Sequence, residues 1–140
     1  MTINFFSEDV TIPKFPKIAV KNILKQISKD KSVALSNVNI IFCSDEHLLD
    51  INIKYLDHDY YTDIITFDYD DVSPKCSDIF ISIDRVTENA ATNNTPFINE
   101  LYRIMCHGLL HICGHSDSTP DEKAVMTQNE DYYLSKILSL

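Results

Sequence analysis

The chain has 140 residues and a formal net charge of −9, with 44% hydrophobic and 24% charged residues. This length and composition are typical of one globular domain with its own hydrophobic core. We therefore interpret residues 1–140 as a single domain. The N-terminus lacks a basic-then-apolar signal pattern, and no apolar run approaches a membrane span, so we expect a cytoplasmic protein without membrane contact. The four cysteines form no CxxC pair, which argues against a cysteine-built zinc site.

The charges are unevenly distributed. The 12 Lys and Arg residues face 21 acidic residues, which argues against indiscriminate binding of nucleic acid. Six of the 12 cations lie between Lys14 and Lys31, whereas seven aspartates lie between Asp57 and Asp78. Three lysines at four-residue spacing would share one helix face: Lys17, Lys21 and Lys25. This face either is simply solvated or contacts the backbone of an RNA strand.

Hydrophobic periodicity predicts alternating strands and helices in the first two thirds of the chain. We expect an edge strand at residues 2–6, a helix at 16–29 and a buried strand at 38–43. Ser44 is a good N-cap for a helix through Tyr55. Two strands rich in Ile, Phe and Thr are predicted at 63–69 and 78–83, joined by a loop around Pro74, and a helix follows at 84–93.

Two further helices are predicted near the C-terminus. Thr95 is a suitable N-cap, with Pro96 at the first helical position, for a helix with a broad apolar face that Gly114 ends. The stretch Thr119-Pro120-Asp121-Glu122 is a capping box, and it begins a last helix that runs to about Leu138. Because helices and strands are interleaved, the sequence predicts an α/β or α+β layer with a small, mostly mixed sheet.

A candidate metal site lies on the first of these two helices. His107 and His111 are four residues apart, so their side chains share a helix face and can bind one metal ion. Gly114 permits the chain to turn back after the helix, which makes Asp117 the expected third ligand. His115 competes with Asp117, but it follows the turn directly and ranks below it. A packed or solvated histidine pair without metal is the alternative interpretation.

Other residues of this segment limit the chemistry. Cys106 and Cys113 are rotated away from the histidine face and are expected to pack in the core. Gly108 costs up to about 1 kcal/mol in a helix, which suggests that a strand or a substrate approaches closely there. Gly108 also occupies the position at which helical zinc proteases carry their glutamate base, so a metalloprotease is a poor second choice. An iron site with two histidines and one carboxylate is a third choice.

Three motifs resemble the YbeY family of metal-dependent endoribonucleases. His107-Gly-Leu-Leu-His111-Ile-Cys-Gly114-His-Ser-Asp117 resembles the family signature HGxLHLxGYDH. The segment from Tyr55 to Phe67 resembles YRxxDxPTDVLSF, and the segment from Ser77 to Ser82 resembles GDIxIS. Met126 and Glu130 match the spacing of the family's last helix. The resemblance covers about residues 38–134.

The resemblance implies an α+β single domain in which helices pack around a mixed, about four-stranded sheet, with the metal site on a central helix. It implies a single-strand-specific endoribonuclease that acts in ribosomal RNA maturation and ribosome quality control by metal-assisted hydrolysis. Its cofactor would be one Zn²⁺ per chain, or another divalent ion, held by His107, His111 and Asp117, with no organic cofactor. Its partners would be ribosomal RNA and ribosomal particles, and a basic ribosomal protein is a further candidate. No general base is assigned, and a ribosome-assembly or binding module with a structural metal is the alternative.

Two residues depart from the family motifs. Asp117 stands where the family signature has histidine, and Leu56 stands where the second motif has arginine. The loss of this arginine puts nuclease turnover in question more than the fold or the metal. Asp63 and Asp78 fall in family blocks and are candidates to cap or orient a loop at the site. Arg103, one turn before the first histidine, is interpreted either as a phosphate contact or as an ion-pair partner of Glu100, and we favour the ion pair.

Overall fold

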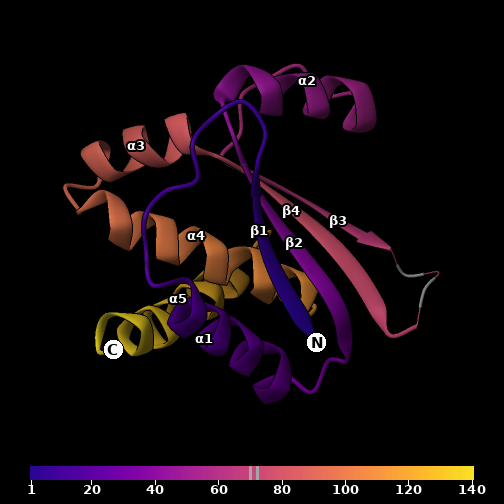
Figure 1. The fold of residues 1–140 in the computed structure, drawn as a ribbon, viewed down its shortest axis with the longest axis vertical. Coiled ribbons are helices and arrows are strands. Elements are labelled where there is room, and N and C mark those ends of the chain that lie inside the picture. The colour runs from indigo at the N-terminus through magenta and orange to yellow at the C-terminus, as the bar shows by residue number, and fades with distance from the viewer. Residues whose placement is uncertain (70, 72) are drawn as a thin grey trace.

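Four strands form one mixed sheet in the computed structural model, which describes residues 1–69, 71 and 73–140. The strands are β1 (Thr2–Ser7), β2 (Leu35–Cys43), β3 (Ile64–Tyr69) and β4 (Lys75–Ser82), and their order across the sheet is β1-β2-β4-β3 (Figure 1). β1 and β4 run parallel to β2, whereas β3 runs antiparallel to β4. This arrangement confirms the predicted α+β class and the edge position of the first strand. Asp70, one of the seven aspartates noted above, lies outside the described residues.

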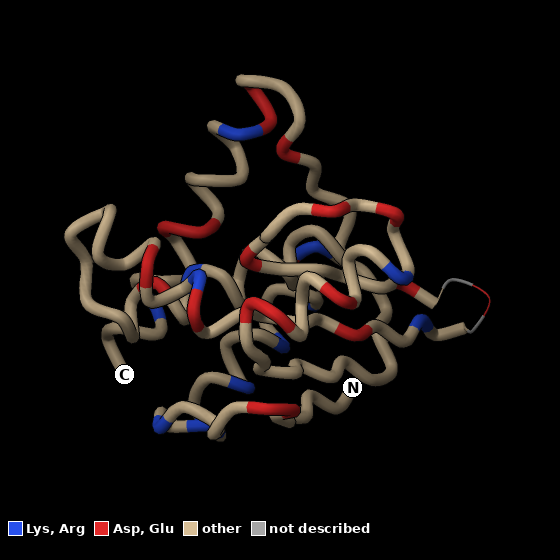
Figure 2. The backbone as a smooth tube through the Cα atoms, turned by 90° about the horizontal axis from the view of Figure 1, so that it is seen from above, with Lys and Arg blue, Asp and Glu red and all other residues tan. Residues whose placement is uncertain are grey.

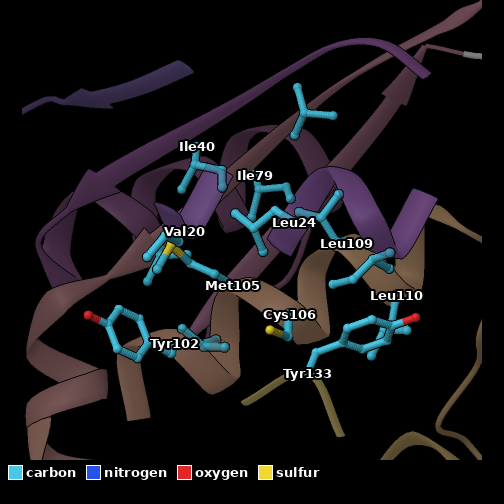
Figure 3. Packing of buried hydrophobic residues seen from close by; sticks show 14 of the residues in the cluster. Val20, Leu24, Ile40, Ile79, Tyr102, Met105, Cys106, Leu109, Leu110 and Tyr133 are labelled. Carbon is cyan, nitrogen blue, oxygen red and sulfur yellow. The ribbon is translucent and has the colours of Figure 1, made fainter. Parts of the chain in front are cut away.

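Within the described residues, five helices surround the sheet: α1 (Lys17–Asp30), α2 (Asp45–Leu56), α3 (Ile83–Thr92), α4 (Phe97–Ile112) and α5 (Pro120–Leu138). Figure 3 shows the main core, in which Ile40 and Ile79 of the sheet meet side chains of α1 and α4, with Tyr133 of α5 beneath them. Because side chains alternate along a strand, the opposite sheet face carries different residues. On that face α2 covers Phe67 and Phe80 at one end of the sheet.

Local signals account for most of the helix ends. The Ser44 hydroxyl accepts a hydrogen bond from the His47 N–H at 3.1 Å, as expected for an N-cap. Thr119 and Glu122 form the reciprocal capping box that begins α5. The predicted cap at Thr95 is wrong, because Pro96 is itself extended and the helix begins at Phe97. Thr95 lies one residue too early to cap the helix, and its hydroxyl instead donates to a Glu100 carboxylate oxygen at 3.3 Å.

The strand β4 begins earlier than predicted, at Lys75 rather than at residue 78. The apolar pattern missed this part because its residues are polar, yet Ser77 is buried and its hydroxyl donates to Asp68 of β3 at 2.6 Å. Throughout the described residues, each buried side-chain nitrogen or oxygen has a hydrogen-bond partner. None of the helices described combines the length and hydrophobicity that a membrane span requires.

Candidate metal centre

The two histidines lie at the C-terminal end of α4, where this helix packs on the sheet. The imidazole centroids of His107 and His111 are 4.5 Å apart, and the rings are inclined by 79°. Gly108 lies between them and faces the sheet: a Cβ atom there would be 3.0 Å from Ile64 Cδ1 and 3.1 Å from Ile79 Cδ1. The close approach expected at this glycine is therefore made by side chains of β3 and β4. The histidines flank this contact and stand at the edge of the domain core.

A tight turn after α4 brings the third side chain back to the histidines. The Gly114 N–H donates to the His111 carbonyl at 2.9 Å, and the His115 N–H donates to the Leu110 carbonyl at 3.0 Å. Gly114 has φ of +95°, a conformation that glycine adopts without a steric penalty. After the turn, Asp117 Oδ2 lies 3.5 Å from Nε2 of His107 and 3.5 Å from Nε2 of His111.

The geometry of these three side chains fits a small divalent cation. One ligand atom from each of His107, His111 and Asp117 lies within 4.8 Å of the other two. A tetrahedral zinc site with bonds of about 2.0–2.1 Å has ligand–ligand distances of about 3.3 Å, close to the 3.5 Å separations seen here. The side chains are 21%, 29% and 39% exposed, so the group is open to solvent on one side. Two imidazoles and one carboxylate can hold Zn²⁺ or another divalent ion.

The structure does not bring the competing candidates to this group. His115 instead borders a separate hollow of about 320 Å³ with Asp121 and Glu122. Cys106 is buried in the main core, where burial raises the pKa of its thiol to about 12, and burial raises that of Cys113 to about 11. Since metal ligation requires the thiolate, burial of this kind favours a packing role for both cysteines.

Comparison with known proteins assigns the chain to a family. The model of the family described as "Endoribonuclease YbeY" matches residues 2–138. The chain belongs to the YbeY endoribonuclease family. Proteins named endoribonuclease YbeY from Cytophaga hutchinsonii and Parabacteroides distasonis are 47% and 42% identical to it over 135 residues, which cover 96% of this chain and 94% and 95% of the relatives. A Bacteroides fragilis protein of the same name is 38% identical and is covered to 97%.

A solved structure shares the fold of this YbeY chain. The solution structure of a Thermotoga maritima protein superimposes with a TM-score of 0.68 at 26% sequence identity. The match covers 99% of this chain and 90% of the other. The mixed sheet and its surrounding helices are therefore a known arrangement, although three quarters of the aligned residues differ.

Two residues behind the YbeY histidines form contacts that the sequence did not reveal. Glu130 of α5 is buried, and its Oε2 lies 2.6 Å from His107 Nδ1. Its other oxygen accepts from Arg103 Nη1 at 3.0 Å, while Arg103 Nη2 donates to Asp131 at 2.6 Å. The predicted Arg103–Glu100 ion pair is therefore wrong, because α5 offers two closer carboxylates. Burial would lower the pKa of His107, but Glu130 and Asp117 together raise it above its ordinary value.

The two aspartates of the YbeY blocks lie in different surroundings. Asp63 is half-buried directly before β3, where burial raises its pKa and the charges of His107 and Asp117 also act on it. Its backbone carbonyl accepts from the Ser82 N–H at 2.9 Å, so it ties the start of β3 to the end of β4. Asp78 precedes Ile79, which faces α4, and so lies on the other face, where it accepts from Tyr69 at 2.9 Å. The proposed role of Asp78 at the site loop is therefore wrong.

Leu56, which stands in place of the family arginine, is 40% exposed and lies at the end of α2. It borders a hollow of about 280 Å³ together with Tyr60 and Ile64, and Ile64 is the residue that contacts Gly108. The chain's two arginines are both engaged elsewhere. Arg103 forms ion pairs with Glu130 and Asp131, and Arg85 forms an ion pair with Asp45 at 3.0 Å. Neither replaces the missing guanidinium at this position.

Proposed function

We propose that this chain is a metal-dependent endoribonuclease that cleaves single-stranded RNA during ribosomal RNA maturation and ribosome quality control. Membership in the YbeY family supports the reaction class, because the relatives carry the name endoribonuclease. The observation that carries the metal dependence is the convergence of His107, His111 and Asp117 within 4.8 Å of one another. Ribosomal RNA and ribosomal particles are the proposed partners.

The proposed roles of the three residues follow from their positions. A bound Zn²⁺ would act as a Lewis acid toward a phosphoryl oxygen and lower the pKa of a coordinated water. His107 and His111 would hold the ion from the C-terminal end of α4, while Asp117 would close the site from the turn. Because all three side chains are partly exposed, an RNA phosphate can approach them from solvent.

The position of Gly108 disfavours a metalloprotease. In helical zinc proteases the residue after the first histidine is a glutamate that serves as general base. Here that position faces Ile64 and Ile79, with as little as 3.0 Å between a Cβ atom and the nearest side chain. A longer side chain could not reach the metal group from Gly108 without moving the helix from the sheet.

A ribosome-binding module with a structural metal is the rival function, and one observation favours it. Leu56 supplies no positive charge, and both arginines are held by carboxylates of the protein itself. A nuclease stabilises developing negative charge with donors of this kind, and loss of one such donor costs about 10²–10³ in rate. The binding-module hypothesis predicts metal content and association with ribosomal particles without RNA cleavage.

Metal analysis paired with a cleavage assay tests the proposal. The purified protein should contain zinc and cleave single-stranded RNA, and cleavage should stop with a chelator and return when zinc is restored. His111→Ala should abolish metal binding, because it leaves a single imidazole with the Asp117 carboxylate, whereas Asp117→Ala leaves both imidazoles. Asp117→Ala should weaken binding, and His115→Ala, the matched control in the same turn, should leave it nearly unchanged.

Three outcomes would contradict this proposal. Cleavage that is insensitive to the chelator would exclude a metal-dependent nuclease. Loss of metal in His115→Ala together with its retention in Asp117→Ala would show that the third ligand is misassigned. A protein that retains metal and binds ribosomal particles, yet never cleaves RNA above the chelated control, would support the binding module instead.

A further inference from the structure

The contact between α5 and the first histidine has a specific geometry. Glu130 is 8% exposed, and both of its carboxylate oxygens are used: Oε2 lies 2.6 Å from His107 Nδ1, and Oε1 lies 3.0 Å from Arg103 Nη1. Arg103 and His107 are one helical turn apart on α4, so both face the same residue of α5. A buried carboxylate is retained at low cost only when its hydrogen bonds are satisfied, and here they are.

From this geometry we propose that Glu130 is a positioning residue for the metal centre, and that Arg103 fixes its orientation. An ionised carboxylate only accepts hydrogen bonds, so the proton of neutral His107 must reside on Nδ1. Nε2 is then left with its lone pair free, and Nε2 is the atom 3.5 Å from Asp117. Glu130 would thus set both the tautomer and the ring orientation that metal binding requires. This inference rests on the proposed metal site and adds a residue to it.

The second histidine provides an internal contrast. Within the part of the chain that the structure describes, no side chain hydrogen-bonds Nδ1 of His111, and the polar partner of its Nε2 is Asp117 at 3.5 Å. The carboxylate support is therefore directed at His107 alone. Because a hydrogen-bonded carboxylate also raises the basicity of the imidazole it contacts, His107 should be the stronger of the two imidazole donors.

Arg103 explains how a buried carboxylate can hold a single orientation. Its guanidinium spans Glu130 and Asp131, at 3.0 Å and 2.6 Å, so the fork is anchored at two points on α5. Each is a charge-assisted hydrogen bond, and two of them to different residues fix the guanidinium as well as neutralising charge. These contacts link α4 to α5 directly behind the candidate metal centre. They also engage Arg103, which the sequence suggested as a phosphate contact, with carboxylates of the protein itself.

Glu130→Gln tests the inference, because it keeps the shape and removes the charge. Affinity for Zn²⁺, measured by competition with a chromogenic chelator, should fall about 10–100-fold, the usual effect of losing such a partner. Asp121→Asn is the matched control: it removes one negative charge from an exposed position of the same helix that does not contact His107. Its affinity for zinc should stay close to that of the unmodified protein.

A second readout separates positioning from mere stability. At a pH above the raised pKa of His107, where its imidazole is neutral, nitrogen NMR of the metal-free protein should report the proton on Nδ1, and Glu130→Gln should shift this tautomer equilibrium. If Glu130→Gln alone fails to fold, the double variant Glu130→Gln with Arg103→Gln is tested in its place. In that variant the two neutral amide side chains can hydrogen-bond each other where Arg103 and Glu130 now meet.

The outcomes distinguish this inference from the proposed function. If the unmodified protein binds neither Zn²⁺ nor Co²⁺, both fail. If it binds zinc and the Glu130 variants bind equally tightly, or weaken only as much as Asp121→Asn, the positioning role is wrong while the metal site stands. An unchanged tautomer in the Glu130 variants would also overturn the role. RNA cleavage does not enter any of these measurements.

Discussion

At the scale of single residues, Leu56 is the departure from the family motif that bears most directly on the proposed nuclease activity. It is 40% exposed and borders the hollow that extends to Ile64, next to the helix that carries the histidines. An arginine side chain at this position can therefore reach solvent without disturbing the core. Substitutions at exposed sites of this kind usually change the free energy of unfolding by less than about 0.5 kcal/mol.

Leu56→Arg should therefore increase cleavage of single-stranded RNA if the chain is a nuclease. A well-placed donor to developing negative charge contributes about 10²–10³ in rate, and that range is an upper limit for an introduced side chain. Cleavage rates of the folded variant measure the gain, which should vanish when His111→Ala is added.

Ile53→Arg is the matched control for this gain. Ile53 is 42% exposed on the same helix, and it does not border the hollow next to Ile64. An equal gain from Ile53→Arg would point to nonspecific attraction of RNA. No gain from a folded Leu56→Arg protein would count against a nuclease that is limited by a missing donor.

The residues of the candidate site were predictable to different degrees. His107, His111 and Asp117 follow from the spacing on one helix and from a single turn glycine, which are local features. The partner of Arg103 was mispredicted because Glu100 is close in sequence, whereas Glu130 is 27 residues away and is brought near only by the packing of α5 on α4. A contact that depends on tertiary packing leaves no periodic signal in the sequence.

At the scale of elements, the contact between α4 and the sheet sets the position of the histidines. Gly108 allows α4 to approach Ile64 of β3 and Ile79 of β4 more closely than an alanine would permit. Local signals explain why the caps at Ser44 and Thr119 were predicted correctly and the start of β4 was not. A cap is a property of four neighbouring residues, whereas β4 extends to Lys75 because it pairs with both β2 and β3.

Gly108→Ala should lower stability slightly despite the better helix propensity of alanine. The propensity gain is up to about 1 kcal/mol, and overpacking a close contact costs about 1–3 kcal/mol, so we expect a net loss of about 0–2 kcal/mol. Chemical denaturation of the metal-free protein measures this change. Ala91→Gly, a substitution in an exposed part of α3, gives the propensity effect alone with the opposite sign. A gain of a full 1 kcal/mol in Gly108→Ala would show that α4 has room at this contact.

At the scale of the whole molecule, the charge distribution limits how RNA can bind. Acidic positions outnumber basic ones over most of the chain, which carries a net charge of −9 (Figure 2). The lysines of α1 are an exception. Lys17 lies over the Phe15 ring at 4.9 Å and Lys21 over the Phe5 ring at 5.5 Å, and among the residues described no carboxylate forms an ion pair with either.

At the end of α1, Lys31 donates to Asn129 of α5 at 2.7 Å, and its charge acts on His115 near the candidate metal centre.

If the lysine face of α1 tracks the RNA backbone, charge reversal there should weaken binding and reduce its salt dependence. Each phosphate contact to a single strand contributes about 0.7 to the slope of log affinity against log salt concentration, so losing three contacts should reduce the slope by about 2.

The triple variant Lys17→Glu, Lys21→Glu and Lys25→Glu is compared with a triple that changes the net charge equally elsewhere: Lys54→Glu, Lys123→Glu and Lys136→Glu. Binding of single-stranded RNA is measured in a His111→Ala background, so that cleavage does not interfere. A general effect of net charge would weaken both triples alike, whereas a track on α1 requires the larger loss of slope in the first. An unchanged slope in the first triple would identify these lysines as a solvated helix face.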